Sequence, residues 1–577
     1  MTLPSSAGPS GRGLSSVHDT PVLIAGAGPV GLALAVELSL RGVQCLVVEP
    51  RPQPTRLRPR AKTLNARTME HARRWGLAAR LRAAAPLPVS WSQDVSFCTT
   101  FLGREITRFT GVLGLADDGD SPERGQQMPQ YVLEEVLREV AAELPTVDLR
   151  LGWRLDRLDE TTAPDRVCAT LTGPAGSATT VAAQYVVGAD GARSVVREQI
   201  GARYVGATAL RPNTGLVFRS QALADAVPHP PAVQTWLLNQ QTPGMMGPID
   251  RHGLWWLIAF GADGRAASFD PGRLITGALG REVPFEVVST DPWTARMELV
   301  DRTRSANGRV FLVGDAAHLN PPFGGHGLNT GIGDAVDLGW KLAAALDGWG
   351  GPRLLDSYEA ERRPLHRRVI DEATANMATL APELLHDDLD RPGPDGDRAR
   401  QAAARRIEET KRAEYFSTDL VLGHRYQDSP VLQAWPGSPG PGASSAAPGR
   451  RLPHRWVSPQ VSTLDLVGRE HAILAADAEL AERAARAAKA AGLPATVTQL
   501  DGPIMRDLGA ALLVVRPDQV VAATWPVPAA GPGPAADAAN HTPQPDPARS
   551  DLTDFLDTTM AMLSGREGAD TTWTRSR

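Results

Sequence analysis

The 577-residue chain has little cysteine, no long apolar run and no excess of one charge. Its three cysteines, Cys45, Cys98 and Cys168, lie far apart without metal-ligand spacing, so neither a disulfide framework nor a cysteine metal site is predicted. No stretch approaches the roughly 20 apolar residues of a membrane span, and residues 1–20 lack the apolar segment of a secretory signal. The 60 basic and 65 acidic residues nearly balance, which argues against a nucleic-acid surface. We therefore expect a cytoplasmic protein without nucleic-acid or membrane partners.

The composition favours several folded domains. Hydrophobic residues make up 42% of the chain, enough for sizeable cores and too many for a disordered protein. The length predicts two or three domains. Lysine is rare beside arginine, while alanine, glycine and proline are abundant, as GC-rich coding would produce.

A glycine-rich turn follows the first strongly apolar segment. Residues 21–25 predict a buried strand, GAGPVG follows at 26–31, and a helix is expected from about Pro29 to Leu40. A second strand, at 44–49, ends in Glu49. Glycines allow a tight turn and the close approach of a pyrophosphate, and Glu49 can accept hydrogen bonds from ribose hydroxyls. Because an acid here disfavours a 2′-phosphate, FAD or NAD is predicted rather than NADP.

Two further strand-to-turn motifs are weaker signals when each is taken alone. VGADGARS (187–194) lies between a predicted strand and a helix. GDAAH (314–318) is followed by NPP (320–322) and GGHGLN (324–329), before a helix expected from about Gly331 to Leu346. A carboxylate at the end of a strand can hold a polyol, and a glycine-rich helix N-terminus can hold a developing anion.

The remaining segments differ in pattern. Residues 203–300 are rich in β-branched and aromatic runs broken by Gly and Pro, which predicts a mainly antiparallel sheet. Residues 355–430 are expected to be helical. Residues 450–525 show a βαβ-like rhythm, and an amphipathic helix is expected at 552–563.

Taken together, the order and spacing of these motifs resemble the class A flavoprotein monooxygenases, which have the p-hydroxybenzoate hydroxylase fold. The resemblance covers residues 20–375 and includes LLDSYEAERRP (354–364). It implies an enzyme that binds FAD tightly and non-covalently, with NAD(P)H as a transient co-substrate. It also implies that O2 is used to hydroxylate a phenolic or polyketide-like aromatic substrate through a C4a-hydroperoxyflavin, as in antibiotic biosynthesis.

The resemblance also implies which residues bind FAD. Asp315 would contact the ribityl chain, and the amides near the start of the last helix would stabilise the negative charge of reduced flavin. The complete set is Gly26, Gly28, Pro29, Val30, Gly31, Glu49, Arg51, Arg60, Gln130, Leu155, Asp190, Asp315, Pro321, Gly325, Gly327, Leu328 and Asn329. No catalytic residue and no metal ligand is assigned, and His318 is expected to be structural.

The substrate site is less defined by the sequence. Trp236, Trp256 and His326 are candidate substrate contacts, although each tryptophan is more readily explained as ordinary core and His326 as a solvated loop residue. His326 stands where the family usually has Gln, and no match to the aspartate that activates simple phenols is evident in residues 60–68. Lys62 and Arg67 are expected on a helix after Arg60, facing solvent, with no role.

The C-terminal region resembles a second known unit. RRLPH (450–454) and VVRPDQVVAATW (514–525) are similar to the thioredoxin-like domain of phenol and aromatic-polyketide hydroxylases. No cysteine lies beyond Cys168, so this unit cannot perform CxxC redox chemistry. A structural role or a role in forming a homodimer is expected, with simple packing as the alternative.

The predicted fold class is α/β: a Rossmann-like FAD-binding domain, an inserted, mainly antiparallel β-sheet substrate domain and a C-terminal thioredoxin-like α/β domain. The predicted boundaries are 1–20 for a disordered arm; 21–86, 121–202 and 301–375 for the discontinuous FAD-binding domain; 87–120 and 203–300 for the substrate domain; 376–435 for a helical connection; 436–449 for a linker; 450–525 for the thioredoxin-like domain; and 526–577 for a tail.

Two motifs that the sequence lacks argue against other flavoenzyme classes. A single dinucleotide fingerprint disfavours the two-fingerprint disulfide reductases and Baeyer–Villiger enzymes. Residues 253–258 lack the W-x-W-x-I-P motif of flavin halogenases. Baeyer–Villiger insertion, epoxidation or oxidative rearrangement on the same fold stay open, as does a catalytically silent flavin-binding protein.

Overall fold

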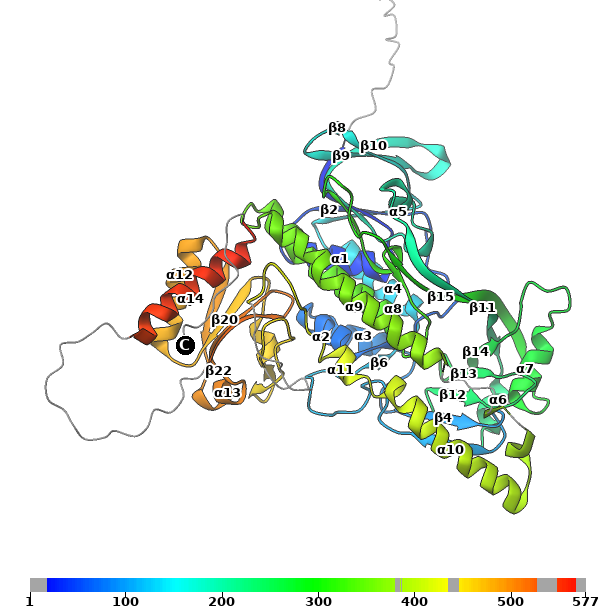
Figure 1. Cartoon of the computed structure of the whole chain (residues 1–577). Coiled ribbons are helices and arrows are strands. Elements are labelled where there is room, and N and C mark those ends of the chain that lie inside the picture. Colours follow the sequence, from blue (N-terminus) through cyan, green and yellow to red (C-terminus); the bar gives the residue numbers. More distant parts are fainter. Residues whose placement is uncertain (1–17, 379–383, 386, 434–445, 527–546, 567–577) are drawn as a thin grey trace, which may run out of the picture.

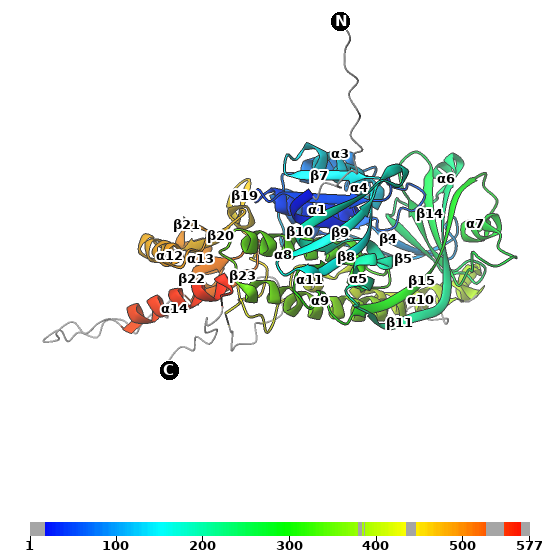
Figure 2. The same cartoon turned by 90° about the horizontal axis from the view of Figure 1, so that it is seen from above.

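The computed structural model describes residues 18–378, 384–385, 387–433, 446–526 and 547–566. The predicted arm up to residue 17, most of the predicted linker and the tail segments 527–546 and 567–577 lie outside these residues. Three parts lie side by side in both views: a central sheet with helices, a larger sheet at one end and a smaller α/β unit at the other (Figures 1 and 2).

The central sheet has seven strands in the order β7-β2-β1-β10-β9-β8, with β16 also paired to β10. Strands β1, β2, β7, β10 and β16 run parallel, as the continuous apolar character of β1, β2 and β16 predicts, and β8 and β9 are antiparallel. The bounds are β1 (His18–Ala25), β2 (Cys45–Glu49), β7 (Val147–Leu151), β8 (Arg154–Ala163), β9 (Arg166–Thr172), β10 (Ala178–Gly188) and β16 (Val310–Leu312).

Helices cover this sheet and share its main core. Helix α1 (Pro29–Ser39) packs between the sheet and α8 (His326–Leu346), and both helices are buried along most of their length. Long α9 (Pro352–Ala378) crosses beside α8 (Figure 1). The smaller elements here are β3 (Thr63–Leu64), α2 (Ala66–Arg74), α3 (Ala78–Ala84), β6 (Gln126–Gln127), α4 (Gln130–Glu143) and α5 (Val195–Gln199).

The second sheet has eight strands in the order β17-β15-β11-β14-β13-β12-β4-β5. It is antiparallel except for the β12–β4 pair, as the pattern of residues 203–300 predicts. Its elements are β4 (Val95–Cys98), β5 (Glu105–Phe109), β11 (Tyr204–Arg219), α6 (Gln221–Ala226), β12 (Gln234–Leu237), β13 (Gly244–Pro248), β14 (Leu254–Phe260), α7 (Pro271–Leu279), β15 (Glu286–Val300) and β17 (His318–Leu319).

The C-terminal unit contains a four-stranded sheet, β21-β20-β22-β23, in which only β20 and β21 are parallel. Helices α12 and α14 pack together on it (Figure 1), and the helix expected at 552–563 is confirmed as part of α14. The elements are β18 (Trp456–Ser458), β19 (Val461–Ser462), β20 (His471–Ala475), α12 (Ala478–Ala491), β21 (Ala495–Gln499), α13 (Gly502–Asp507), β22 (Ala510–Val515), β23 (Val521–Pro526) and α14 (Pro547–Ser564).

Helices α10 (Gly393–Tyr415) and α11 (Thr418–Val421) connect the parts, and α10 packs against the eight-stranded sheet. The structure corrects the start of α8, which begins at His326 and not near Gly331. Gly325, at φ +68, makes the left-handed turn that lets the helix start there. Within the described ranges, no helix combines the length and the apolar character needed to cross a membrane. The thioredoxin likeness and the domain boundaries stay predictions.

Candidate cofactor and substrate site

The three motifs of the sequence meet at one edge of the central sheet, where β1, β2, β10 and β16 end. The Ala189 N–H donates to the Ala25 carbonyl (2.8 Å), and the Gly26 N–H donates to the Val48 carbonyl (2.8 Å). The Val313 N–H donates to the Gly188 carbonyl (3.0 Å). The carboxyl edge of a parallel sheet is the usual place for a ligand in this kind of fold.

The glycines of the first turn have different roles. Gly26 has φ +107, and a Cβ there would lie 2.4 Å from the Ala189 carbonyl oxygen. A Cβ at Gly31 would lie 2.0 Å from the Gly26 carbonyl oxygen. Gly28 has φ −74, which any residue adopts, and nothing lies within 4 Å of its Cβ position. Gly26 and Gly31 are therefore needed for the fold, whereas Gly28 borders open space at the N-terminus of α1, which fits a pyrophosphate.

Glu49 lies beside this turn. Its Oε2 accepts from the Ala27 N–H (3.1 Å), and its Oε1 accepts from the Arg51 N–H (3.0 Å) and Nε (2.8 Å). The carboxylate thereby holds Arg51, whose side chain is 47% exposed, at the mouth of the turn. A carboxylate has about four acceptor positions, so one stays free for a ribose hydroxyl.

Arg60 and Gln130 come together, although 70 residues of chain separate them. The Gln130 N–H, at the start of α4, donates to the carbonyls of Pro59 (3.1 Å) and Ala61 (2.9 Å). These two bonds bracket Arg60 and hold it at φ +48 with its side chain exposed. Leu155, in contrast, is buried in the core beneath β2.

Two carboxylates end the neighbouring strands in different surroundings. Asp190 accepts from the Ser194 hydroxyl (2.5 Å) and the Val196 N–H (3.1 Å), so it is engaged with the start of α5. Asp315 is exposed, and among the described residues no hydrogen-bond or ion-pair partner of its carboxylate is found. The loop of Asp315 touches the loop of Gly191, which places both motifs at the same edge.

The N-terminus of α8 is fastened to the segment before α2. The Asn329 side chain donates to the Thr63 carbonyl (3.0 Å) and accepts from the Asn65 N–H (3.0 Å). The amides of Gly327 and Leu328, in the first helical turn, have no partner within the helix and can face an anion. Pro321 is buried in the preceding loop.

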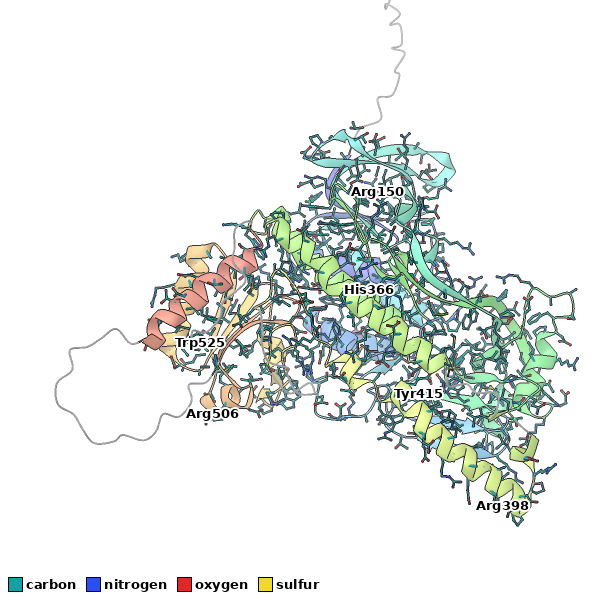
Figure 3. The ribbon with its side chains drawn as sticks, viewed as in Figure 1. Arg150, His366, Arg398, Tyr415, Arg506 and Trp525 are labelled. Carbon is teal, nitrogen blue, oxygen red and sulfur yellow. The ribbon has the colours of Figure 1, made fainter. Side chains whose placement is uncertain are left out.

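A buried polar cluster fixes the loop that carries Asp315. One oxygen of Asp334 accepts from the Gly314 N–H (3.0 Å) and His318 Nε2 (3.0 Å). The other accepts from Arg362 Nε (2.8 Å) and His366 Nε2 (2.7 Å); His366 lies midway along α9 (Figure 3). Burial alone would raise the pKa of Asp334, but the adjacent histidines and guanidinium hold it well below its usual range. Both oxygens of Asp334 thus accept hydrogen bonds, and the cluster ties the loop of Asp315 to α8 and α9.

The candidate substrate residues lie in unequal surroundings. Trp236 is fully buried between Phe97 and Phe323 and donates to the Tyr415 hydroxyl at the end of α10 (Figure 3). Trp256 is 2% exposed, and its Nε1 has no hydrogen-bond partner in the part of the chain that the structure describes. The ammonium group of Lys62 lies 3.7 Å from the centroid of the Trp256 ring.

The expectation for Lys62 is therefore wrong. Lys62 lies before β3, not on a helix, and its half-buried side chain places the ammonium group on Trp256 of the eight-stranded sheet. Arg67 does lie on α2, but its guanidinium donates to Gln519 (2.7 Å) and to the Asp518 carbonyl (2.6 Å) of the C-terminal unit. Local pattern missed both because their partners are distant in sequence.

His326 borders a cavity that the sequence did not reveal. This cavity of about 100 Å³ lies between the start of α8 and the C-terminal unit and is also lined by His71 and His424. Within the described ranges, no hydrogen-bond partner is found for His326 Nε2, for His71 Nδ1 or for either ring nitrogen of His424. Burial lowers the pKa of His326 to about 4, so the ring is neutral near pH 7.

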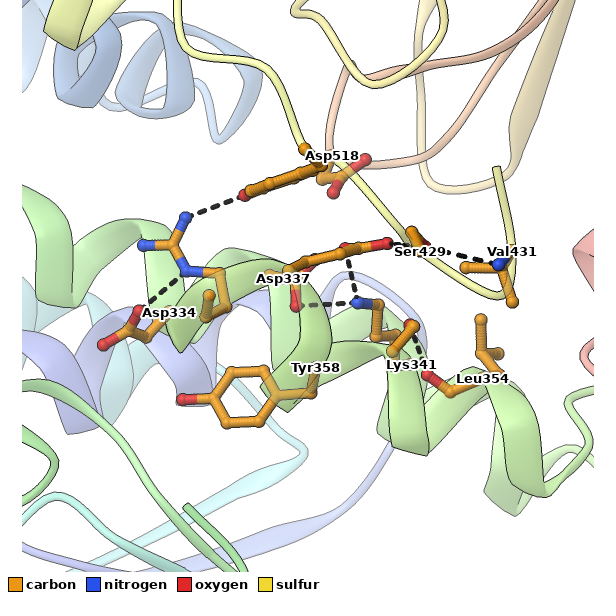
Figure 4. Close-up of polar contacts among 12 residues, drawn as sticks. Asp334, Asp337, Lys341, Leu354, Tyr358, Ser429, Val431 and Asp518 are labelled. Atoms are coloured by element: carbon orange, nitrogen blue, oxygen red, sulfur yellow. Dashed lines mark hydrogen bonds and ion pairs between the residues drawn. The ribbon is translucent and has the colours of Figure 1, made fainter. Parts of the chain in front are cut away.

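A buried ion network joins the C-terminal unit to α8 and α9 (Figure 4). Arg516 donates to Glu361 (2.6 Å) and Asp337 (3.0 Å), and Lys341 donates to the same two carboxylates (2.9 and 2.8 Å). Glu361 belongs to the segment 354–364 that the sequence singled out. Through Glu361, this segment of α9 is linked to Lys341 of α8 and to Arg516 of the C-terminal unit.

Comparisons with known proteins agree with this geometry. The sequence profile of the FAD binding domain family matches residues 19–373. A putative polyketide hydroxylase of Streptomyces halstedii is 34% identical over 572 residues, which cover 90% of this chain and 96% of that protein. RebC with bound 7-carboxy-K252c superimposes with a TM-score of 0.83 at 33% identity, covering 95% of this chain and 100% of that one. Aklavinone-11 hydroxylase, in a ternary complex with FAD and aklavinone, gives a TM-score of 0.78 at 28% identity, covering 96% and 100%.

Proposed function

The chain belongs to the FAD binding domain family, as an FAD-dependent monooxygenase of the class A type, and from this premise we propose that it hydroxylates a polyketide-like aromatic substrate with NAD(P)H and O2. The observation that carries the proposal is the meeting of Gly28, Glu49 and Asp315 with the start of α8 at one sheet edge. This arrangement supports one extended dinucleotide ligand running along the ends of β2, β1, β10 and β16.

The first turn would hold the ADP half of FAD. The open space at Gly28 lets the backbone approach the pyrophosphate, and the N-terminus of α1 supplies a positive potential. Glu49 would bind the ribose with its free acceptor position, and Arg51, held by Glu49, would lie near the phosphates. Gly26, Pro29, Val30 and Gly31 shape this turn.

The second half of the site would hold the ribityl chain and the flavin ring. Asp315, exposed and without a partner among the described side chains, is suited to bind ribityl hydroxyls. The amides of residues 327–329 would stabilise negative charge at the pyrimidine side of the ring. When bound, FAD takes two electrons from a reductant and activates O2. Arg60, Gln130, Leu155, Asp190, Pro321 and Gly325 are proposed as supporting contacts.

The eight-stranded sheet would cover the reacting face and exclude water. Its inner surface carries large apolar side chains, among them Trp256 and Phe260, that suit a flat aromatic ligand. The names of the relatives, a polyketide hydroxylase and an aklavinone-11 hydroxylase, favour a multi-ring phenol over a single-ring one.

Purified protein tests the proposal directly. We expect a yellow protein that releases FAD on denaturation and oxidises NAD(P)H faster when a hydroxylated anthraquinone or naphthacene is added. The product should gain 16 mass units from O2, traced with 18O2. A yellow protein in which no such substrate accelerates flavin reduction would refute the proposed reaction while leaving FAD binding intact.

A further inference from the structure

Lysine is scarce in this chain, and its few positions are informative. The sequence contains four lysines, Lys62, Lys341, Lys411 and Lys489, against more than ten times as many arginines. Lys489 is exposed, Lys341 and Lys411 are buried, and Lys62 is half-buried. Because arginine supplies almost every surface cation, these other three lysines mark places where a compact ammonium ion replaces the broad guanidinium.

Two of the interior lysines have carboxylate partners. Lys341 pairs with Asp337 (2.8 Å) and Glu361 (2.9 Å), and Lys411 pairs with Glu414 (2.9 Å). Lys62 differs, because no carboxylate among the described residues lies within ion-pair distance of its ammonium group. Its contact is the face of Trp256, 3.7 Å from the ring centroid. A cation–π contact attracts the ammonium ion but does not neutralise it.

The surroundings of Lys62 are poor in water and in charge. Loss of water around the ammonium group lowers the pKa of Lys62 to about 8, and no neighbouring charge contributes to this shift. Beside it, the Trp256 Nε1 is buried without an acceptor. An unpaired cation next to an unpaired donor is costly in a folded protein, unless a ligand supplies the missing acceptor.

The position of Lys62 shows where that ligand would lie. Lys62 immediately precedes Thr63, whose carbonyl is bound by Asn329 in the first turn of α8, the helix assigned to the flavin. Trp256 belongs to β14, in the middle of the sheet assigned to the substrate. The Lys62–Trp256 contact therefore joins the segment next to the start of α8 to the eight-stranded sheet.

We propose that Lys62 is a specificity-determining residue, whose ammonium ion binds an ionised oxygen, phenolate or carboxylate, on the aromatic ring of the substrate. Trp256 then lies against the same ring and offers its indole N–H to a neighbouring oxygen. This inference rests on the proposed function, since it places the substrate between α8 and the eight-stranded sheet. A cation here stabilises the ionised form of a phenol, the form that is richest in electrons for oxygen transfer.

Ring-matched probes test the proposal in the FAD-loaded protein. The first pair is 2,6-dichloro-4-nitrophenol, ionised at pH 7, and its methyl ether; the second is 1-hydroxy-2-naphthoate and its neutral amide. Binding is followed by the change in flavin absorbance. For at least one pair we expect the anion to bind tenfold or more tightly than its neutral partner. Lys62→Met should abolish this preference, and Lys62→Arg should restore part of it.

The scarcity of lysine also allows a direct observation in the unmutated protein. With 13Cε-labelled lysine, NMR would show four side-chain signals, and the one missing in Lys62→Met identifies Lys62. A bound anion should raise the pKa of Lys62, whereas the neutral partner should not. Lys489→Met, on the exposed face of α12, is the matched control and should leave binding and the Lys62 signal unchanged.

The outcomes separate the two proposals. Failure of every anion to bind preferentially, an unchanged preference in Lys62→Met, or a Lys62 pKa that no anion moves would each overturn the role of Lys62. Hydroxylation of a substrate with an unchanged preference would leave the proposed function standing without Lys62. Conversely, anion binding through Lys62 without substrate-stimulated NAD(P)H oxidation would keep the binding role and refute the proposed reaction.

Discussion

Replacing Gly28 by alanine separates cofactor binding from folding. Nothing lies within 4 Å of a Cβ at this position, and its backbone conformation, φ −74 and ψ 175, is open to alanine. In the cofactor-bound protein the same space would hold the pyrophosphate. We therefore expect Gly28→Ala to fold normally and to lose FAD.

The backbone conformation and the free space at each glycine set the expected change in stability of the two variants. At a compatible backbone position, Gly→Ala stabilises a protein by about 0.4–1 kcal/mol, so the flavin-free variant should be at least as stable as the flavin-free native protein. With FAD at one hundred times its Kd, the native protein gains about 2.7 kcal/mol, and the variant should gain almost none. Gly26→Ala, at φ +107 and 2.4 Å from the Ala189 oxygen, should instead cost the flavin-free protein about 2–5 kcal/mol.

Two measurements on each variant give the answer. Absorbance near 450 nm after purification reports bound flavin, and thermal unfolding with and without added FAD reports stability. A Gly28→Ala protein that stays yellow, or one that is as unstable without flavin as Gly26→Ala, would refute the assignment of Gly28 to the pyrophosphate.

Three further predictions concern buried charges. Arg516→Met leaves the buried carboxylates of Glu361 and Asp337 with Lys341 as their one remaining cation in the network, so chemical denaturation should show a loss of about 3–5 kcal/mol. Exposed Arg486→Met should cost less than about 0.5 kcal/mol, and equal losses would contradict the network. Folding lowers the pKa of Lys62 from 10.5 to about 8, so the charged side chain destabilises the folded protein below pH 8. Lys62→Met should therefore raise the free energy of unfolding by up to about 3 kcal/mol below pH 8, and this gain should fade as the pH rises towards 10.5. Destabilisation of the variant at pH 7 would argue against an unpaired ammonium group. Because the pKa of Asp334 is held well below its ordinary value of 3.8, its stabilising charge is fully present above about pH 4 and is lost as the pH falls further. Asp334→Asn should therefore lower Tm at pH 7 and flatten the decline of Tm below about pH 4; a decline as steep as the native one would contradict this role.

Short-range patterns in the sequence were sufficient to predict the first strand, turn, helix and second strand. The apolar strand, the glycine turn, the helix and Glu49 lie within 30 residues of one another, and each signal depends on local backbone geometry or on burial of a whole segment. The antiparallel sheet of residues 203–300 is predictable for the same reason. The start of α8 was misplaced because its first turn is rich in glycine and polar residues, which weaken the apolar pattern by which a helix is predicted.

The sequence by itself therefore determined the α/β class, the dinucleotide turn and the family resemblance. Only the tertiary structure decided which glycine of the turn borders open space and that Asp334 pairs with a histidine and a guanidinium from α9. It also decided that Lys62 meets Trp256 with no carboxylate partner among the described residues. The physical reason is the range of the forces. Hydrophobic period and backbone strain act over a few residues, whereas burial and pairing of a charge depend on side chains that folding brings together from distant parts of the chain.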